Sequence, residues 1–167
     1  MDETPAELSA LQELLDATFA RASEHLLSIM QPQRRLSAEQ LVADLTGICV
    51  LNLATVTARG EPRISAVDGH FLHGRWHFTT DAGSPKARQM RSRPAVSVSY
   101  TPRDGYGMFC HGRAHRLERG TPEFTRFYDH CVRVYGGSPD DWGADIAYLQ
   151  VEPAWLVGFT FGREEPA

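Results

Sequence analysis

The segment from Phe78 to Lys86, with the sequence FTTDAGSPK, combines hydroxyl groups, a helix start and a positive charge. Two threonines end a β-rich run, and the Ser-Pro pair that follows is typical of a helix N-cap and first residue. The first turn of a helix has free backbone N–H groups and the positive end of the helix dipole. The segment therefore predicts a phosphate-binding site. Its candidate residues for the phosphate are Ser84, Lys86 and Arg88, with Pro85 as the first residue of the helix. Arg63, on the preceding predicted strand, is expected to reach the same anion if the two strands form a hairpin.

Charge along the chain supports an anion site in the same region. Lys86 is the only lysine among 17 basic residues, and the net charge is −4. Residues 59–119 hold 11 basic and 5 acidic residues, whereas the rest of the chain holds 6 basic and 16 acidic residues. The alternative is that Ser84 and Pro85 simply begin a helix and that Lys86 is a solvated surface charge. The coincidence of the lone lysine, the basic segment and the threonine pair favours anion binding.

Seven histidines and three cysteines are the other residues that could do chemistry. His70, His73 and His77 have a ligand-like spacing, but they fall on a predicted hairpin, where the side chains need not converge, so we predict no metal site. Three widely spaced cysteines without a Cys-x-x-Cys pair predict buried, inert thiols rather than disulfides. No triad of nucleophile and base stands out, so the catalytic residues are left unknown.

Helices are expected at the start of the chain. Thr4-Pro5-Ala6-Glu7 forms a capping box, and apolar residues then recur at helical spacing to Ile29, which predicts one amphipathic helix over the first thirty residues that ends at Pro32. A second capping box at Ser37 begins a short helix that stops near Gly47. Residues 1–46 are thus interpreted as a helical extension of a single domain spanning 1–167.

Short β-rich runs separated by Gly and Pro follow from Ile48 onward. Strands are predicted over 48–57, 63–72, 75–80, 95–101 and 107–117, with a helix from Ser84 to before Pro94. A second helix capped by Thr121 precedes one or two final strands over 144–161, interrupted at Pro153. Six or so antiparallel strands with connecting helices favour a small closed barrel, that is, a mainly β fold with flanking helices (α+β). Residues 47–118 would form its core and 119–167 the last helix and strands.

Five separate pieces of this region resemble the pyridoxamine 5′-phosphate oxidase-like flavin-binding split barrels. They are Ala54-Thr55-Val56, Gly60 to Ser65, Trp76 to Thr80, Ser84 to Met90 with Arg93 to Val98, and Gly112-Arg113-Ala114. The resemblance covers about residues 45–118, and it implies a six-stranded antiparallel split β-barrel of the FMN-binding type. It also implies a homodimer with two cofactor sites at the subunit interface.

The resemblance further implies which residues line the flavin site. Those matching the family pattern are Arg63, Ile64, Ser65, Phe78, Thr79, Thr80, Ser84 and Lys86, the last two on the phosphate. Related oxidoreductases that use the deazaflavin F420 have a similar Ser-x-Lys helix start, so FMN and F420 remain alternatives. Some split barrels bind haem, and His111 or His115 would then be the axial-ligand candidates.

The expected function is an FMN-dependent oxidoreductase that transfers hydride to or from a small organic substrate. An F420-dependent reductase, or a haem- or flavin-binding carrier or sensor without turnover, are the alternatives. The sequence departs from pyridoxamine phosphate oxidases proper, because it has Gly107 to His111 on the fifth strand and Phe159 to Arg163 at the end instead of the family's glutamine and Arg-Leu substrate motif. We expect no nucleic-acid partner, since the net charge is negative, and a cytoplasmic, non-membrane location.

Overall fold

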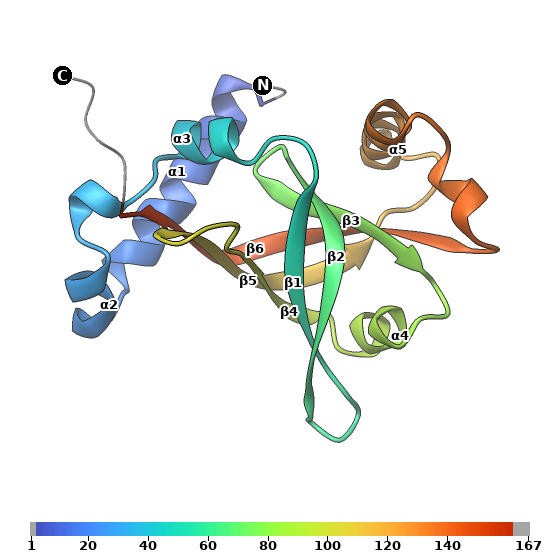
Figure 1. Ribbon diagram of the computed structural model, residues 1–167, viewed down its shortest axis with the longest axis horizontal. Helices are drawn as coiled ribbons and strands as arrows, with labels where there is room; N and C mark the ends of the chain where they lie inside the picture. Colours follow the sequence, from blue (N-terminus) through green and yellow to red (C-terminus); the bar gives the residue numbers. More distant parts are fainter. Residues whose placement is uncertain (1–2, 162–167) are drawn as a thin grey trace.

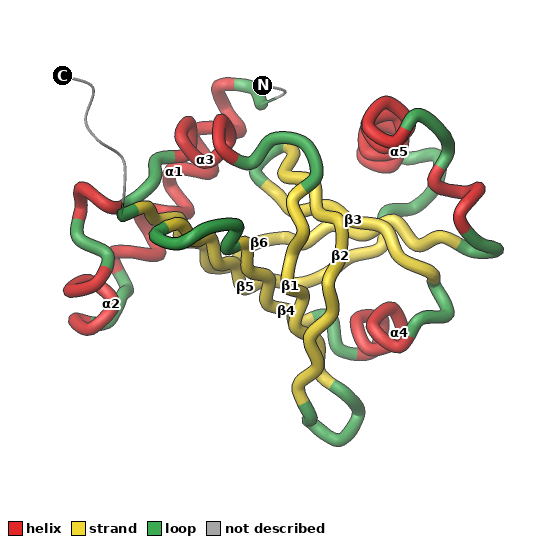
Figure 2. Tube along the Cα trace, in the orientation of Figure 1, coloured by secondary structure: helices red, strands yellow, loops and turns green. Residues whose placement is uncertain are grey.

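The computed structural model describes residues 3–161 and has a closed antiparallel β-barrel at its centre (Figures 1 and 2). Its strands are β1 (Cys49–Val56), β2 (Pro62–Leu72), β3 (Arg75–Asp81), β4 (Ala95–Tyr100), β5 (Tyr106–Arg116) and β6 (Ile146–Thr160). Around the barrel they are ordered β1-β2-β3-β6-β5-β4. The predicted six-stranded antiparallel barrel with flanking helices is confirmed.

Two of the six strand pairings are short, and they divide the barrel into two parts. β2 pairs with β3 only from Leu72↔Arg75 to Gly69↔Phe78, and β1 pairs with β4 through three residues. The β1 and β2 hairpin therefore projects from the remaining strands, as Figure 1 shows. The pairing ends at Gly69 and Phe78. Before Gly69 on β2 and after Phe78 on β3, the two strands separate, and their edges are not hydrogen-bonded to each other in the sheet.

The N-terminal region packs against one end of the barrel (Figure 1). It contains α1 (Pro5–Ala20), α2 (Glu24–Ile29), the short 3₁₀ helix η1 (Pro32–Arg34) and α3 (Ala38–Asp44). The prediction of one helix over the first thirty residues is wrong, because α1 ends at Ala20 and Ser23 caps a new helix by accepting a hydrogen bond from the Leu26 N–H. Both predicted capping boxes, at Thr4 and at Ser37, are present.

The other helices lie at the opposite end of the barrel in Figure 1. They are α4 (Pro85–Ser92), α5 (Pro122–Tyr135) and the 3₁₀ helix η2 (Pro139–Trp142). Phe124, Phe127 and Cys131 of α5 are buried against Ile146 and Tyr148 of β6. No helix among residues 3–161 is long and apolar enough to cross a membrane.

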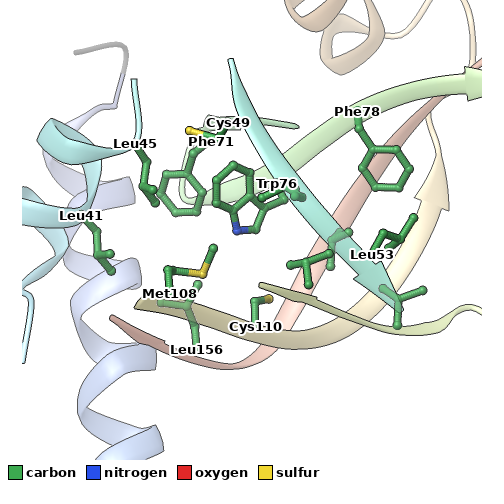
Figure 3. Close-up of a cluster of buried hydrophobic side chains, with 14 of the residues drawn as sticks. Leu41, Leu45, Cys49, Leu53, Phe71, Trp76, Phe78, Met108, Cys110 and Leu156 are labelled. Atoms are coloured by element: carbon green, nitrogen blue, oxygen red, sulfur yellow. The ribbon is translucent and has the colours of Figure 1, made fainter. Parts of the chain in front are cut away.

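Apolar side chains from the strands and from α3 fill the barrel (Figure 3). Trp76, Phe78, Leu53, Met108 and Leu156 are among the fully buried ones. Burial of this kind is the main source of stability in a barrel of this size. The three cysteines are buried and unpaired, as predicted, and burial raises the pKa of the Cys110 and Cys131 thiols to about 12.

The last strand, β6, runs without a break through Pro153. The register passes from His111↔Trp155 to Gly112↔Pro153, so that Ala154 is an extra residue on β6. Pro153 has no N–H to donate to the sheet, and it is accommodated because it lies next to this bulge. The final strand is therefore continuous, and the predicted interruption at Pro153 is wrong.

Candidate functional site

A groove of 400 Å³ lies where β2 and β3 separate. Its lining comes from four parts of the chain: β2, β3 with the start of α4, the end of α5 with η2, and the start of β6. The lining residues are Ala66, Val67, Asp68, Thr79, Thr80, Asp81, Lys86, Tyr135, Trp142 and Ile146. Its volume is in the range of small-molecule and cofactor sites in proteins.

Lys86 is the positive charge of the groove. Its side chain is partly buried, and within residues 3–161 it makes no ion pair with a carboxylate. It stands in the first turn of α4, where Ser84 caps the helix by accepting a hydrogen bond from the Ala87 N–H at 3.3 Å. The Thr80 hydroxyl lies 3.3 Å from the Ser84 hydroxyl. The end of β3, the cap and the lysine thus form one continuous polar surface.

The position of α4 is fixed on both sides. The Thr55 hydroxyl of β1 donates to the Gln89 side-chain oxygen at 2.6 Å, and Met90 is buried in the barrel core. In the preceding loop, the Gly83 N–H donates to the Asp81 carboxylate at 2.7 Å. Lys86 is therefore held in the lining of the groove by a supported helix rather than by a free loop.

Three of the ten predicted site residues, Thr79, Thr80 and Lys86, line the groove. Ser84 and Pro85 begin the helix that carries Lys86. The side chain of Phe78 lies in the barrel core instead, fully buried, as Figure 3 shows. Its strand position alternates with that of Thr79, so the two side chains point to opposite faces.

The remaining predicted residues lie outside the groove lining. The Arg63 guanidinium forms an ion pair with Glu61 at 2.7 Å near the tip of the β1 and β2 hairpin. The Arg88 guanidinium donates a hydrogen bond to the carbonyl oxygen of Gly83, in the loop that precedes α4. Ile64 is 74% exposed and Ser65 is partly buried, and both precede the lining residue Ala66 on β2. In the single chain, Lys86 is thus the basic residue of the groove.

Sequence reasoning missed two aromatic residues of the groove lining. Tyr135 ends α5 and Trp142 ends η2, and their rings meet edge to face with centroids 4.6 Å apart. Trp142 is 52% exposed, which is high for a large aromatic side chain. The pair Gly136-Gly137 that follows Tyr135 is a local signal for the end of a helix, but nothing local in the sequence places this helix end beside β2 and β3.

Two carboxylates, Asp68 and Asp81, also line the groove. Burial, and next the negative charge of Asp68, raise the pKa of Tyr135 well above its usual range. Tyr135 is therefore a neutral hydrogen-bonding group at physiological pH. The groove lining thus combines the Lys86 cation with the Asp81 carboxylate, which precedes α4, and a second pair of polar groups at Tyr135 and Asp68.

The two histidines considered as haem ligands lie on β5 and are exposed. The Nδ1 atom of His111 lies 2.8 Å from the Ser97 hydroxyl, and its ring stacks on Trp155 with centroids 4.6 Å apart. His115 lies 3.5 Å from the Glu152 carboxylate. Neither residue lines the groove, so a haem site would be a separate surface on the barrel.

Comparisons with known proteins show which solved structures and which family the chain is similar to. Several solved structures are similar to the chain. A FAD-binding protein from Mesorhizobium loti has a TM-score of 0.60 and 22% identity, with 75% of this chain and 93% of that chain covered. The haem storage protein HutZ from Vibrio cholerae has a TM-score of 0.59 and 16% identity, with 78% and 96% covered. These two likenesses show the shared fold alone.

An F420 reductase has a TM-score of 0.52 and 26% identity, with 67% of this chain and 91% of that chain covered. A search of curated proteins finds no match. The family model described as pyridoxamine 5′-phosphate oxidase matches residues 37–157, which include every strand of the barrel except the last three residues of β6. The chain therefore belongs to the pyridoxamine 5′-phosphate oxidase family.

Proposed function

We propose that the protein is an FMN-dependent oxidoreductase whose cofactor lies in the groove between β2 and β3. The observation that carries this proposal is the placement of Lys86. The only lysine of the chain is partly buried in the first turn of α4, faces the groove and has no carboxylate partner among residues 3–161. The charge of a lysine that lines a groove and has no carboxylate partner is available to an anionic ligand, and a phosphate group would supply the opposite charge.

Each part of the groove has a role in this proposal. The Lys86 ammonium group and the first turn of α4 hold the phosphate, with the hydroxyls of Thr80 and Ser84 beside it. The strand edges of β2 and β3 that do not pair with each other offer backbone donors and acceptors to a heteroaromatic ring. Tyr135 and Trp142 offer aromatic surface against it. The bound flavin would supply hydride chemistry, while the chain binds and orients the ring and its substrate.

An F420-dependent reductase is the second candidate function. Its support is the 26% identity with an F420 reductase, which exceeds the identity with the other two structures described above. F420 also carries a phosphate group, so the role of Lys86 would be unchanged. The two cofactors differ in their absorption spectra, which makes them simple to separate by experiment.

A haem-binding carrier is a third candidate, supported by the setting of His111. The contact of Nδ1 with the Ser97 hydroxyl fixes the imidazole ring, as the partners of metal-bound histidines commonly do. This arrangement directs Nε2 away from Ser97. A substitution of His111 that removed haem binding would support this candidate.

We further propose that the protein works as a homodimer. Val50 of β1 is 59% exposed and Ile64 of β2 is 74% exposed, and both lie on the outward side of the hairpin. Ile64 is two residues from Ala66, so both side chains point to the same face of β2. A partner seated on this apolar face would border the groove and complete it.

The test of the proposed function is the visible absorption spectrum of the purified protein, followed by titration with FMN, F420 and haem. The proposal expects stoichiometric FMN binding and reduction of the bound flavin by a nicotinamide. A stoichiometric haem complex without flavin binding would support the carrier. Binding of F420 but not FMN would support the second candidate, and stable FMN binding without reduction by any donor would contradict the enzyme assignment.

A further inference from the structure

Three side chains form a hydrogen-bonded chain that connects α5 with β2. His130 Nε2 lies 3.0 Å from His70 Nδ1, and His70 Nε2 lies 2.9 Å from the Tyr135 hydroxyl. His70 comes from β2, and His130 and Tyr135 come from α5. We call these three residues the histidine relay. Both contacts are as short as good hydrogen bonds between nitrogen and oxygen or nitrogen atoms.

The two ends of the histidine relay lie at different cavities. Tyr135 lines the groove between β2 and β3. His130 lines a separate cavity of 630 Å³ between α1, α5 and the β2 and β3 hairpin, and also a smaller pocket of 130 Å³ beside α3. His70 itself is buried, with 1% of its surface exposed. The relay is thus a direct polar connection between the large cavity and the groove.

The protonation state of His70 suits proton transfer. Burial, and next the charge of His130, lower the pKa of His70 to about 4, so its imidazole is neutral at physiological pH. A neutral imidazole has one N–H donor and one acceptor nitrogen. In one arrangement Tyr135 donates to His70, and His70 donates to His130. In the other, His130 donates to His70, and His70 donates to Tyr135, whose own hydroxyl proton then points elsewhere.

We propose that the histidine relay delivers protons from the large cavity to the groove, with Tyr135 as the acid that touches the substrate. This inference rests on the proposed function. A bound flavin or deazaflavin would supply hydride to a polar double bond of the substrate, and the substrate would then carry a negative charge that needs a proton. The Tyr135 hydroxyl donates its proton to that anion, His70 passes its Nε2 proton to Tyr135, and His130 passes its Nε2 proton to His70. His130 then takes up a proton from solvent at Nδ1. Each of the three residues thus regains one proton for the one that it gives away.

Charged and titratable groups surround the histidine relay from several elements. Asp68 of β2 and Cys131 of α5 lie close enough to Tyr135 to raise its pKa. His77 of β3 is close enough to His70 to be affected by its charge, together with His73 and Arg75. The large cavity that His130 lines is also lined by carboxylates and arginines, namely Glu7, Glu123, Arg126, Asp129, Arg133 and Glu152. Solvent protons at His130 therefore have many exchange partners.

A measurement on the cofactor-free protein tests the connection itself. In protein labelled with ¹⁵N at histidine, the hydrogen bond predicts a scalar coupling between His70 Nδ1 and His130 Nε2. Tyr135→Phe removes the partner of His70 Nε2. We expect the ¹⁵N shifts of His130 to change, although among residues 3–161 the Tyr135 hydroxyl is hydrogen-bonded only to His70. A missing coupling, or unchanged His130 shifts in the variant, would contradict the relay.

A kinetic experiment tests the function of the histidine relay. Bound FMN is reduced anaerobically with dithionite and mixed with menadione, a quinone whose reduction takes up hydride and one proton. We expect His130→Ala to slow reoxidation about tenfold or more and added imidazole to restore it, because positioned acid-base groups contribute factors of this size or larger. The Tyr135→Phe variant should be equally slow and should not respond to imidazole.

His73→Asn is the matched control, since His73 lines the same cavity outside the relay and Asn tolerates its φ of 53°. We expect this variant to reoxidise at the wild-type rate. A His130→Ala variant that binds FMN normally but is not slowed, or is slowed without rescue by imidazole, would overturn the relay alone. Absence of FMN and F420 binding in the wild type would instead overturn the proposed function, and with it the role of the relay.

Discussion

His77 shows how burial and hydrogen bonding set the protonation of a single residue. Its Nδ1 lies 3.2 Å from the Arg75 carbonyl oxygen, and its Nε2 lies 3.0 Å from the Gln150 side-chain nitrogen. These contacts fit a neutral ring with the proton on Nδ1, which donates to the carbonyl while Nε2 accepts. Burial lowers the pKa of His77 to about 3, and that of His70 to about 4.

We therefore predict that the protein loses stability in mild acid. Between pH 6.5, the usual histidine pKa, and the lowered values, the unfolded chain binds more protons than the folded chain. The stabilising contribution is complete above about pH 6.5 and declines as pH falls toward 4 and then 3, by roughly 1.4 kcal/mol per pH unit for each histidine.

Urea denaturation at pH 7.5, 5.5 and 4.5 measures this dependence. His77→Gln should flatten the pH dependence relative to the wild type, whereas His25→Gln, at an exposed position of α2, should leave it unchanged. Equal free energies of unfolding at pH 7.5 and 4.5 in the wild type would contradict burial of two neutral histidines.

Among the elements, β5 and β6 form the longest strand pair of the barrel, and their bulge depends on Gly112. A Cβ atom at Gly112 would clash with the Glu152 carbonyl oxygen and would lie 2.9 Å from the Glu152 carbonyl carbon. These are backbone atoms of the bulge, which cannot move as the end of a flexible side chain can. Gly112 is therefore required by close packing between two strands.

We predict that Gly112→Ala destabilises the protein by about 1–3 kcal/mol, the usual cost of forcing extra volume into a packed site. Gly137→Ala is the matched control, because nothing lies within 4 Å of a Cβ atom there. Thermal unfolding followed by circular dichroism compares the two. If both variants unfold at the wild-type temperature, the described packing at the bulge is incorrect.

Most elements could be predicted from the sequence because their signals are local. Strand bounds follow from alternating side chains between Gly and Pro turns, and the helix starts follow from Thr4, Ser37, Ser84 and Thr121. The break after Ala20 was missed because the apolar spacing continues across it. The continuity of β6 was missed because the bulge that tolerates Pro153 depends on the partner strand.

Only the part of the groove around Ser84 and Lys86 could be predicted, because only that part has a local sequence signal. Ser84 and Lys86 form a motif within three residues, so the sequence alone indicated an anion site. Tyr135 and Trp142 approach that motif only through the packing of α5 and η2 beside the barrel, and no sequence spacing encodes this approach. Arg63, which was expected near the phosphate, is held by its neighbour Glu61 in the single chain.

At the scale of the whole molecule, the exposed side of the β1 and β2 hairpin indicates a dimer. We predict that Val50→Glu and Ile64→Glu each convert a dimer into a monomer, because a buried, unpaired carboxylate opposes association. Val134→Glu, on α5, should leave the dimer intact. Light scattering coupled to gel filtration measures the mass, and a wild-type mass equal to the 18.6 kDa of one chain would contradict the dimer.

The proposed role of Lys86 is to hold the phosphate of a flavin in the groove between β2 and β3. The most direct test compares the binding of FMN with that of riboflavin, which lacks the phosphate, to the wild type, to Lys86→Met and to the control Arg91→Met in the last turn of α4. Loss of a charged hydrogen bond costs about 1.5 to 3 kcal/mol, so Lys86→Met should weaken FMN binding about 10- to 150-fold. Riboflavin binding should not change, and Arg91→Met should bind both as the wild type does. Equal weakening of FMN and riboflavin by Lys86→Met, or no weakening of FMN, would contradict the account.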